Sequence, residues 1–329
     1  MNTFGQLFKI QIFGESHGDF VGITIDGCPP GISIKEEDFK TDLARRKSGA
    51  KGTTPRKEND KPIIISGIYK EHTTGSPITI LFENKNTHSS DYNFRAQPRP
   101  GHADFVADKK YRSFNDDRGG GHFSGRLTLG LVAAGVIAKK IIHKTTIKAK
   151  LTEAGNNKNI AKAVENAVKS GDSIGGIIEC TVSNVPTGLG EPFFNSAESL
   201  ISHAVFSIPG IKGIEFGSGF AAAKMKGSEH NDLIINKEGK TRTNHAGGIN
   251  GGITNGNDIV FRIVVKPTSS ISLPQETFNF ETGKIETLEI KGRHDACFAL
   301  RVPVIVEAVT ACVLADLSLI TNDLITNYE

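Results

Sequence analysis

The chain has 329 residues, with 39 Lys and Arg against 36 Asp and Glu, and thus a net charge of +3. Such a balanced charge argues against a nucleic-acid-binding protein, and we expect no run that approaches the ~20 apolar residues of a membrane span and no signal peptide. The cysteines at 28, 180, 297 and 312 are isolated and have no metal-binding spacing, so we expect a reduced, cytoplasmic protein without a bound metal.

Hydrophobic periodicity predicts alternating strands and helices along the chain. In the first strand, Phe8, Ile10 and Ile12 share one face while Lys9 and Gln11 share the other. Helices 127–142 and 303–320 are apolar on nearly every face, which predicts that both are buried. In chain order we expect strands at 7–13, 21–26, 62–68, 77–83, 175–182 and 258–265, and helices at 36–47, 127–142, 160–169, 197–206 and 303–320.

Local signals predict how three of these helices begin. Ser33 with Glu36, and Asn195 with Glu198, have the spacing of a capping box. Pro303 suits the first position of the last helix, because proline lacks the amide hydrogen that would be unpaired there.

A weak internal similarity predicts two related halves. Residues 23–31 and 177–188 both have a strand, then a Pro/Gly turn, then a capped helix. No Pro/Ser-rich linker separates the halves, so we expect a single α+β domain over residues 1–329. The irregular stretches 84–126 and 227–257 are long for a compact domain, which favours functional loops.

Residues 99–126 have the composition of an anion site with proton chemistry beside it. Three consecutive glycines, 119–121, precede the apolar helix, and backbone amides entering a helix bind anions. Arg99, Arg118 and Arg126 add forked donors that match phosphate and carboxylate groups. His102 and His122 can transfer protons near neutral pH.

Four further polar segments are individually ambiguous. They are Gly14–Gly18, which follows the first strand, Asn244–Gly252, Lys266–Ser270 and Lys291–Asp295. Each can be read as an ordinary turn or surface loop, or as part of a ligand site. None fits a Gly-x-Ser-x-Gly elbow, a P-loop or a dinucleotide fingerprint.

Together these segments resemble the chorismate synthase family along nearly the whole chain. The three signature segments of that family match residues 14–29, 121–138 and 293–308, and residues 99–104 and 266–270 also look like family motifs. The resemblance implies a β-α-β sandwich and a carbon–oxygen lyase. That enzyme eliminates phosphate from 5-enolpyruvylshikimate 3-phosphate in an anti 1,4 sense to give chorismate, with reduced FMN and without net redox change.

The resemblance also implies roles for individual residues. His17 matches the histidine that protonates the departing phosphate. His102 matches the histidine that manages the proton on reduced flavin. Asp295 matches the carboxylate that relays the C6 proton through flavin N5. The expected substrate cations are Arg46, Arg99, Arg126 and Arg293. The expected FMN-binding residues are His122, Phe123, Ser124, Pro209, Gly210, Gly251, Lys266, Pro267, Thr268, Ser269, Ser270 and Arg293.

Some details depart from the family pattern. His122-Phe123-Ser124 replaces an Arg-Ser-Ser found in some members, and Gly49–Gly52 stands where some relatives carry an arginine associated with NADPH. NADPH is a candidate reductant, with Arg46 as its expected contact. The family resemblance also implies a homotetramer. The alternative for Asp295 is a structural role, in which its carboxylate forms an ion pair that holds Arg293. The alternative functions of the protein are a flavin oxidoreductase with an anionic substrate, a nucleic-acid-binding protein or an acid/base phosphatase.

Overall fold

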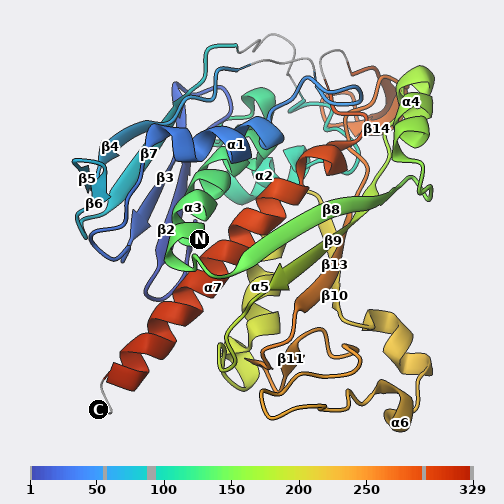
Figure 1. Cartoon of the computed structure of the whole chain (residues 1–329). Helices are drawn as coiled ribbons and strands as arrows, with labels where there is room; N and C mark the ends of the chain where they lie inside the picture. The colour runs from blue at the N-terminus through green and yellow to red at the C-terminus, as the bar shows by residue number, and fades with distance from the viewer. Residues whose placement is uncertain (1, 55–57, 87–93, 291–293, 327–329) are drawn as a thin grey trace.

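The computed structural model has two antiparallel sheets with a layer of helices between them (Figure 1). It describes residues 2–54, 58–86, 94–290 and 294–326. The first sheet has the strand order β1 (Thr3–Phe4), β2 (Lys9–Gly14), β3 (Phe20–Asp26), β7 (Ile78–Glu83) and β4 (Ile63–Ser66). The second has the order β10 (Ile211–Phe216), β13 (Ile259–Val265), β9 (Gly176–Ser183) and β8 (Thr146–Ala154).

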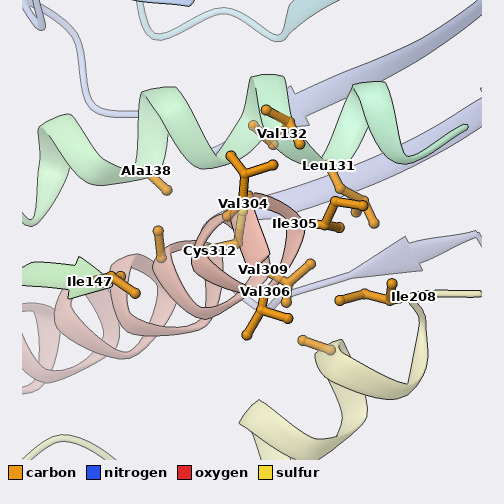
Figure 2. Packing of buried hydrophobic residues seen from close by; sticks show 14 of the residues in the cluster. Leu131, Val132, Ala138, Ile147, Ile208, Val304, Ile305, Val306, Val309 and Cys312 are labelled. Atoms are coloured by element: carbon orange, nitrogen blue, oxygen red, sulfur yellow. The ribbon is translucent and has the colours of Figure 1, made fainter. Parts of the chain in front are cut away.

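Four helices form the central layer: α1 (Glu36–Arg46), α3 (Thr128–Ile141), α5 (Ala197–Phe206) and α7 (Pro303–Thr326). Helix α3 lies along α7, and Figure 2 shows Val132 and Leu131 of α3 beside Val304 and Ile305 of α7. A Cβ atom on Gly135 would lie 2.3 Å from Cβ of Ala308, so this glycine allows the two helices to approach closely.

The two halves of the chain repeat one topology. In each half two strands pair, a helix follows, and two more strands enter the sheet in the order first–second–fourth–third before a long buried helix. Thus β2, β3, α1, β4, β7 and α3 correspond to β8, β9, α5, β10, β13 and α7. Helix α4 (Ile160–Ser170) is an addition to the second half. These observations confirm the α+β sandwich with an internal duplication.

Smaller elements surround this frame. Two-stranded ribbons are formed in the described part of the chain by three pairs of strands: β5 (Ile68–Tyr69) with β6 (His72–Thr73), β11 (Ile249–Asn250) with β12 (Ile253–Thr254), and β14 (Gln275–Asn279) with β15 (Lys284–Leu288). The short helices are α2 (Asp104–Tyr111), α6 (Gly227–His230), and the 3₁₀ segments η2 (Arg118–Phe123), η3 (Gly125–Leu127), η4 (Phe193–Asn195), η5 (Gly219–Lys224) and η6 (Phe298–Arg301).

The periodicity predictions hold, but both capping boxes were wrong. Helix α1 begins after Lys35, whose amide donates to the Asp38 carboxylate at 2.7 Å, and Ser33 instead forms a bridge with His72. Helix α5 begins after Ser196, whose hydroxyl accepts from the Ser199 amide at 3.1 Å, so Asn195 is not its cap. The spacing rule found each helix start within a few residues, yet a competing side chain supplied the cap.

The expectation that no segment approaches a membrane span was wrong, because helix α7 has the length and the apolar composition of one. The window Pro303–Asn322 of α7 has a mean hydropathy of 2.0 over 20 residues. Burial accounts for this hydropathy, because 78% of the window is buried inside the protein. Helix α7 is therefore the core helix of this fold.

Candidate active site

A cleft of about 970 Å³ brings together the polar segments that the sequence singled out. Its lining comes from the end of α1, the loop before α2, the glycine segment η2, the turn before β10, the segment after β13 and the segment before η6. The predicted site residues in the lining are Arg46, Arg99, His102, His122, Phe123, Ser124, Arg126, Pro209, Gly210, Lys266, Pro267, Thr268, Ser269 and Asp295.

The remaining predicted residues lie elsewhere. His17 is buried behind the lining residue Gly119, and Ser270 is buried where its hydroxyl accepts from Nη1 of Arg99 at 3.0 Å. Gly251 lies in the turn between β11 and β12, a hairpin that contributes nothing to the cleft lining. Arg293 lies outside the described residues.

Arg46 and Arg126 converge on Asp60 in the wall of the cleft. Nη1 of Arg126 donates to Oδ1 of Asp60 at 2.6 Å, and Nη1 of Arg46 lies 3.7 Å from Oδ2. All three residues are less than 10% exposed. Burial lowers the pKa of Arg46, and the nearby charges of Arg301 and Arg126 add to this effect, while Asp60 opposes it. An anion in the cleft would offset the crowding of these cations.

The guanidinium groups of Arg46 and Arg126 also donate hydrogen bonds to other protein groups. Arg126 also donates to Oδ1 of Asn84 at 2.6 Å and to the Glu83 carbonyl at 2.9 Å. Arg46 donates to the Thr128 hydroxyl at 3.1 Å and to the Gly125 carbonyl at 2.9 Å. Their orientation is therefore fixed before any ligand binds, which reduces the entropy lost on binding.

Asp295 also lines the cleft, and its carboxylate accepts from Thr54 and Arg301 among the described residues. Oδ1 accepts the Thr54 amide at 2.8 Å, and Nη1 of Arg301 lies 3.1 Å from Oδ2. The sequence suggested an ion pair between Asp295 and Arg293, which lies outside the described residues, whereas the ion pair that the structure shows is with Arg301. These donors orient the carboxylate, and the side chain, which is 14% exposed, is accessible from the cleft.

His102 forms a compact unit with Arg99 and Asp104. Nδ1 of His102 lies 2.5 Å from Oδ1 of Asp104, while Arg99 donates to both carboxylate oxygens at 2.7 and 2.8 Å. Although burial alone would favour the neutral acid, hydrogen bonds from Arg99 and His102 hold the pKa of Asp104 well below its usual range. Nη2 of Arg99 also lies 3.0 Å from Nδ1 of His102, so Asp104 and Arg99 together fix the orientation of the ring.

The triple-glycine segment passes between the two predicted acid/base histidines. Gly119, Gly120 and Gly121 all have positive φ, at 60°, 81° and 51°. A Cβ atom on Gly119 would lie 2.4 Å from the His17 ring, and one on Gly120 would lie 3.6 Å from His102. The Ser16 amide donates to the Gly121 carbonyl at 3.1 Å, which ties the first signature segment to the glycines. Arg118 supports the segment through its ion pair with Asp116 at 2.7 Å.

The segment after β13 supplies groups suited to a phosphorylated cofactor. Nζ of Lys266 donates to the Ser269 hydroxyl at 2.6 Å, and burial, together with Lys212, lowers the pKa of Lys266. Oγ1 of Thr268 is buried and has no hydrogen-bond partner within the described part of the chain. An unpaired buried hydroxyl costs about 1–3 kcal/mol, which a polar ligand atom in the cleft would recover. The donor set therefore fits a phosphate group or a hydroxyl-bearing chain of a ligand.

Sequence reasoning missed several residues of this site. Asp60, Thr54, Ser16 and Arg301 all line the cleft. Arg301 lies in the third signature segment, six residues after Asp295, so that segment contained a usable signal. Asp60 had none, because its role depends on contacts with residues from α1 and η3. Among the described residues no group of three or more His, Cys, Asp or Glu side chains could hold a metal ion.

The fold and the cleft define an α+β enzyme with a cationic, preorganised site for a polyanionic substrate. The sequence model of the chorismate synthase family matches residues 8–319, and the chain belongs to that family. Chorismate synthase of Chitinophaga pinensis is 62% identical, covering 97% of each chain. Chorismate synthase of Thermococcus kodakarensis is 42% identical, covering 95% of this chain and 96% of the relative. A structure described as "Crystal Structure of Chorismate Synthase" superposes with a TM-score of 0.73 at 25% identity, covering 97% and 93%.

Family membership establishes the reaction. The chain is a carbon–oxygen lyase of the shikimate pathway that converts 5-enolpyruvylshikimate 3-phosphate to chorismate and phosphate. The family requires a reduced flavin. The alternative of a flavin oxidoreductase is not favoured.

Proposed function

We propose that the cleft binds reduced FMN and the substrate together, with the phosphate and carboxylates of the substrate held by Arg46, Arg99, Arg126 and Arg293. The observation that carries this assignment is the convergence of buried, preoriented guanidinium groups on one cleft that also contains His102 and Asp295. The substrate carries a phosphate and two carboxylates, so several fixed cations are needed to offset their repulsion.

The flavin would be held by residues 122–124, 209–210 and 266–270, with Gly251 and Arg293 as further predicted contacts. The unpartnered Thr268 hydroxyl and the Lys266 ammonium group support this placement. Nδ1 of His122 lies 2.8 Å from the carbonyl oxygen of Gly14, and Nε2 lies 3.2 Å from Oδ1 of Asn2. His122 therefore also anchors the N-terminal segment. When bound, reduced flavin supplies electron density that assists departure of the allylic phosphate.

Three side chains manage the protons. His17 delivers a proton to the departing phosphate, His102 manages the proton on the reduced cofactor, and Asp295 accepts the proton that leaves C6. The carboxylate of Asp104 orients His102, and the guanidinium of Arg301 orients Asp295. His17 is one layer behind the lining at Gly119, so its action requires access past the glycine segment.

The remaining assignments are proposals of the same kind. NADPH is the candidate reductant, with Arg46 as its contact. One continuous hydrophobic core, with residues from Phe8 to Leu317, supports a single domain. The four buried free cysteines support a cytoplasmic location.

A homotetramer, which the family resemblance implies, is also proposed. Helix α7 does not provide the contact surface, because most of it is buried within the subunit. The exposed side chains of Phe193, Phe194 and Phe220, at 86%, 93% and 84%, instead provide apolar surface for association.

An anaerobic assay tests the proposed function. With photoreduced FMN and 5-enolpyruvylshikimate 3-phosphate we expect stoichiometric chorismate and phosphate without net consumption of reductant, and a parallel assay with NADPH and oxidised FMN tests intrinsic reduction. His17→Ala and His102→Ala should each lower kcat by about 10²–10⁴-fold while FMN still binds. Reductant consumption matched to product would contradict the proposal, as would near-normal turnover for the residue concerned.

A further inference from the structure

Arg301 links two separate parts of the cleft. It ends η6 immediately before α7, is 9% exposed and lines the cleft. Nη1 lies 3.1 Å from Oδ2 and 3.3 Å from Oδ1 of Asp295. The guanidinium thus fixes one side of the carboxylate to which we have assigned the C6 proton.

The second contact of Arg301 is with the end of α1. Its Nε donates at 3.0 Å to the carbonyl of Arg46, the last residue of that helix. The final carbonyls of a helix lack intrahelical partners and carry partial negative charge, so a buried cation stabilises this end. The same residue, Arg46, provides a predicted substrate cation in the cleft.

The contacts of Asp295 show how much depends on this one side chain. Besides its contacts with Arg301, the carboxylate accepts the Thr54 amide on Oδ1 at 2.8 Å. A single donor leaves a carboxylate able to rotate about it, whereas two donors from different segments define its plane. A carboxylate displaced by about 1 Å loses much of its catalytic effect.

We propose that Arg301 is a positioning residue for the elimination: it orients the Asp295 carboxylate and at the same time fixes the end of α1 that carries Arg46. The proton acceptor and a substrate-binding cation therefore keep a constant separation. This inference rests on the proposed role of Asp295.

Arg301→Lys separates the two contacts, because one ammonium group cannot donate to Asp295 and replace Nε at the Arg46 carbonyl together. We expect kcat to fall about 10-fold and KM for the substrate to rise, with FMN affinity, followed by flavin absorbance, within about threefold of wild type. Arg301→Gln, which retains hydrogen-bond donors without charge, is the second variant if lysine disturbs folding. It should show the same fall in kcat and rise in KM, with FMN affinity again within about threefold of wild type.

Arg45→Lys is the matched control. Arg45 precedes Arg46 in α1 and donates to both oxygens of Glu307 at 2.6 and 2.7 Å, but it does not line the cleft. Because Arg45 is 40% exposed, we expect only a modest change in thermal stability, with kcat within about twofold of wild type. Equal losses of kcat in both variants would overturn the inference, because they would indicate a general effect on the fold.

A double-mutant cycle with Asp295→Asn completes the test. If Arg301 acts on catalysis through Asp295, the double variant should have a kcat within about twofold of Asp295→Asn alone. Additive losses in kcat would overturn the inference while leaving the role of Asp295 intact. Turnover of Asp295→Asn within a few fold of wild type would instead overturn the proposed role of Asp295, and with it the route through which Arg301 acts.

Discussion

Gly119 lies directly against the imidazole of His17: a Cβ atom at position 119 would be 2.4 Å from both Cδ2 and Nε2 of that ring. With φ at 60°, Gly119 also adopts a conformation that L side chains rarely take. The glycine thus lets the backbone pass between the buried histidine and the cleft. Closeness to the His17 ring, as well as turn geometry, explains the glycine at position 119.

The contact predicts a specific effect of Gly119→Ala. The methyl group would displace His17 or the glycine segment, so we expect kcat to fall by about 10²-fold. Gly31→Ala is the control, because Gly31 has φ at 85° but no atom within 4 Å of the place that its new methyl group would occupy. Both variants should lose about 1 kcal/mol in chemical denaturation through the strained φ, and Gly119→Ala should lose more because its methyl group must also displace a neighbour. Comparable kcat values in the two would contradict the assignment.

Asp104→Asn should affect both turnover and acid stability. Because the pKa of Asp104 is lowered in the fold, its contribution to stability is present above the unfolded value of about 3.9 and is lost as pH falls towards the folded value. The difference in unfolding free energy between wild type and variant should therefore be largest near neutral pH and shrink below about pH 4. We also expect kcat to fall at least about 10-fold, because His102 loses its orienting carboxylate.

Asp38→Asn provides the comparison for this experiment. The pKa of Asp38 is also lowered: burial opposes the shift, and the hydrogen bonds from Lys140 and the Lys35 amide outweigh it. The acid stability profile should change in the same sense, but kcat should not, since Asp38 lies outside the cleft lining. Asp104→Asn with normal kcat would remove Asp104 from the site.

Arg126→Lys should weaken both the fold and substrate binding. The guanidinium donates to Asp60, Asn84 and the Glu83 carbonyl from a position only 6% exposed, and an ammonium group cannot reproduce this geometry. We expect a loss of about 2 kcal/mol in urea denaturation and a clear rise in KM. Arg262→Lys, at a more exposed pair with Glu215, should change neither. A destabilised variant with unchanged KM would show that Arg126 is purely structural.

Thr268→Val should separate cofactor binding from folding. Since Oγ1 of Thr268 lacks a partner within the described residues, a methyl group in its place should leave apo-protein stability equal or slightly higher. Isothermal titration should show FMN binding weakened by about 5–10-fold, the value of one hydrogen bond. Thr152→Val, which removes a hydrogen bond to the Ile177 carbonyl, should instead lower apo-protein stability and leave FMN affinity unchanged. Unchanged FMN affinity in Thr268→Val would exclude this hydroxyl from the cofactor site.

Much of the frame was predictable because its signals are local. Alternation in β2 and β9 and the apolar runs of α3 and α7 predicted elements that the structure has within a few residues. Strand β8 was missed although Ile147, Ala149 and Leu151 alternate with Lys148 and Lys150, so its signal was present in the sequence. Helix α2 has almost no amphipathic pattern, since its only buried residue is Ala107, and periodicity could not find it.

The sequence by itself determined the family, the reaction and the set of chemical groups, because five ordered motifs carry them along the chain. Tertiary structure alone decided which groups meet: Arg126 with Asp60, Arg301 with the Arg46 carbonyl, and His17 with Gly119. The partners in the second contact are 255 residues apart. Periodicity and capping depend on neighbours within a few residues, whereas such pairings depend on where two buried helices and two sheets bring distant segments together.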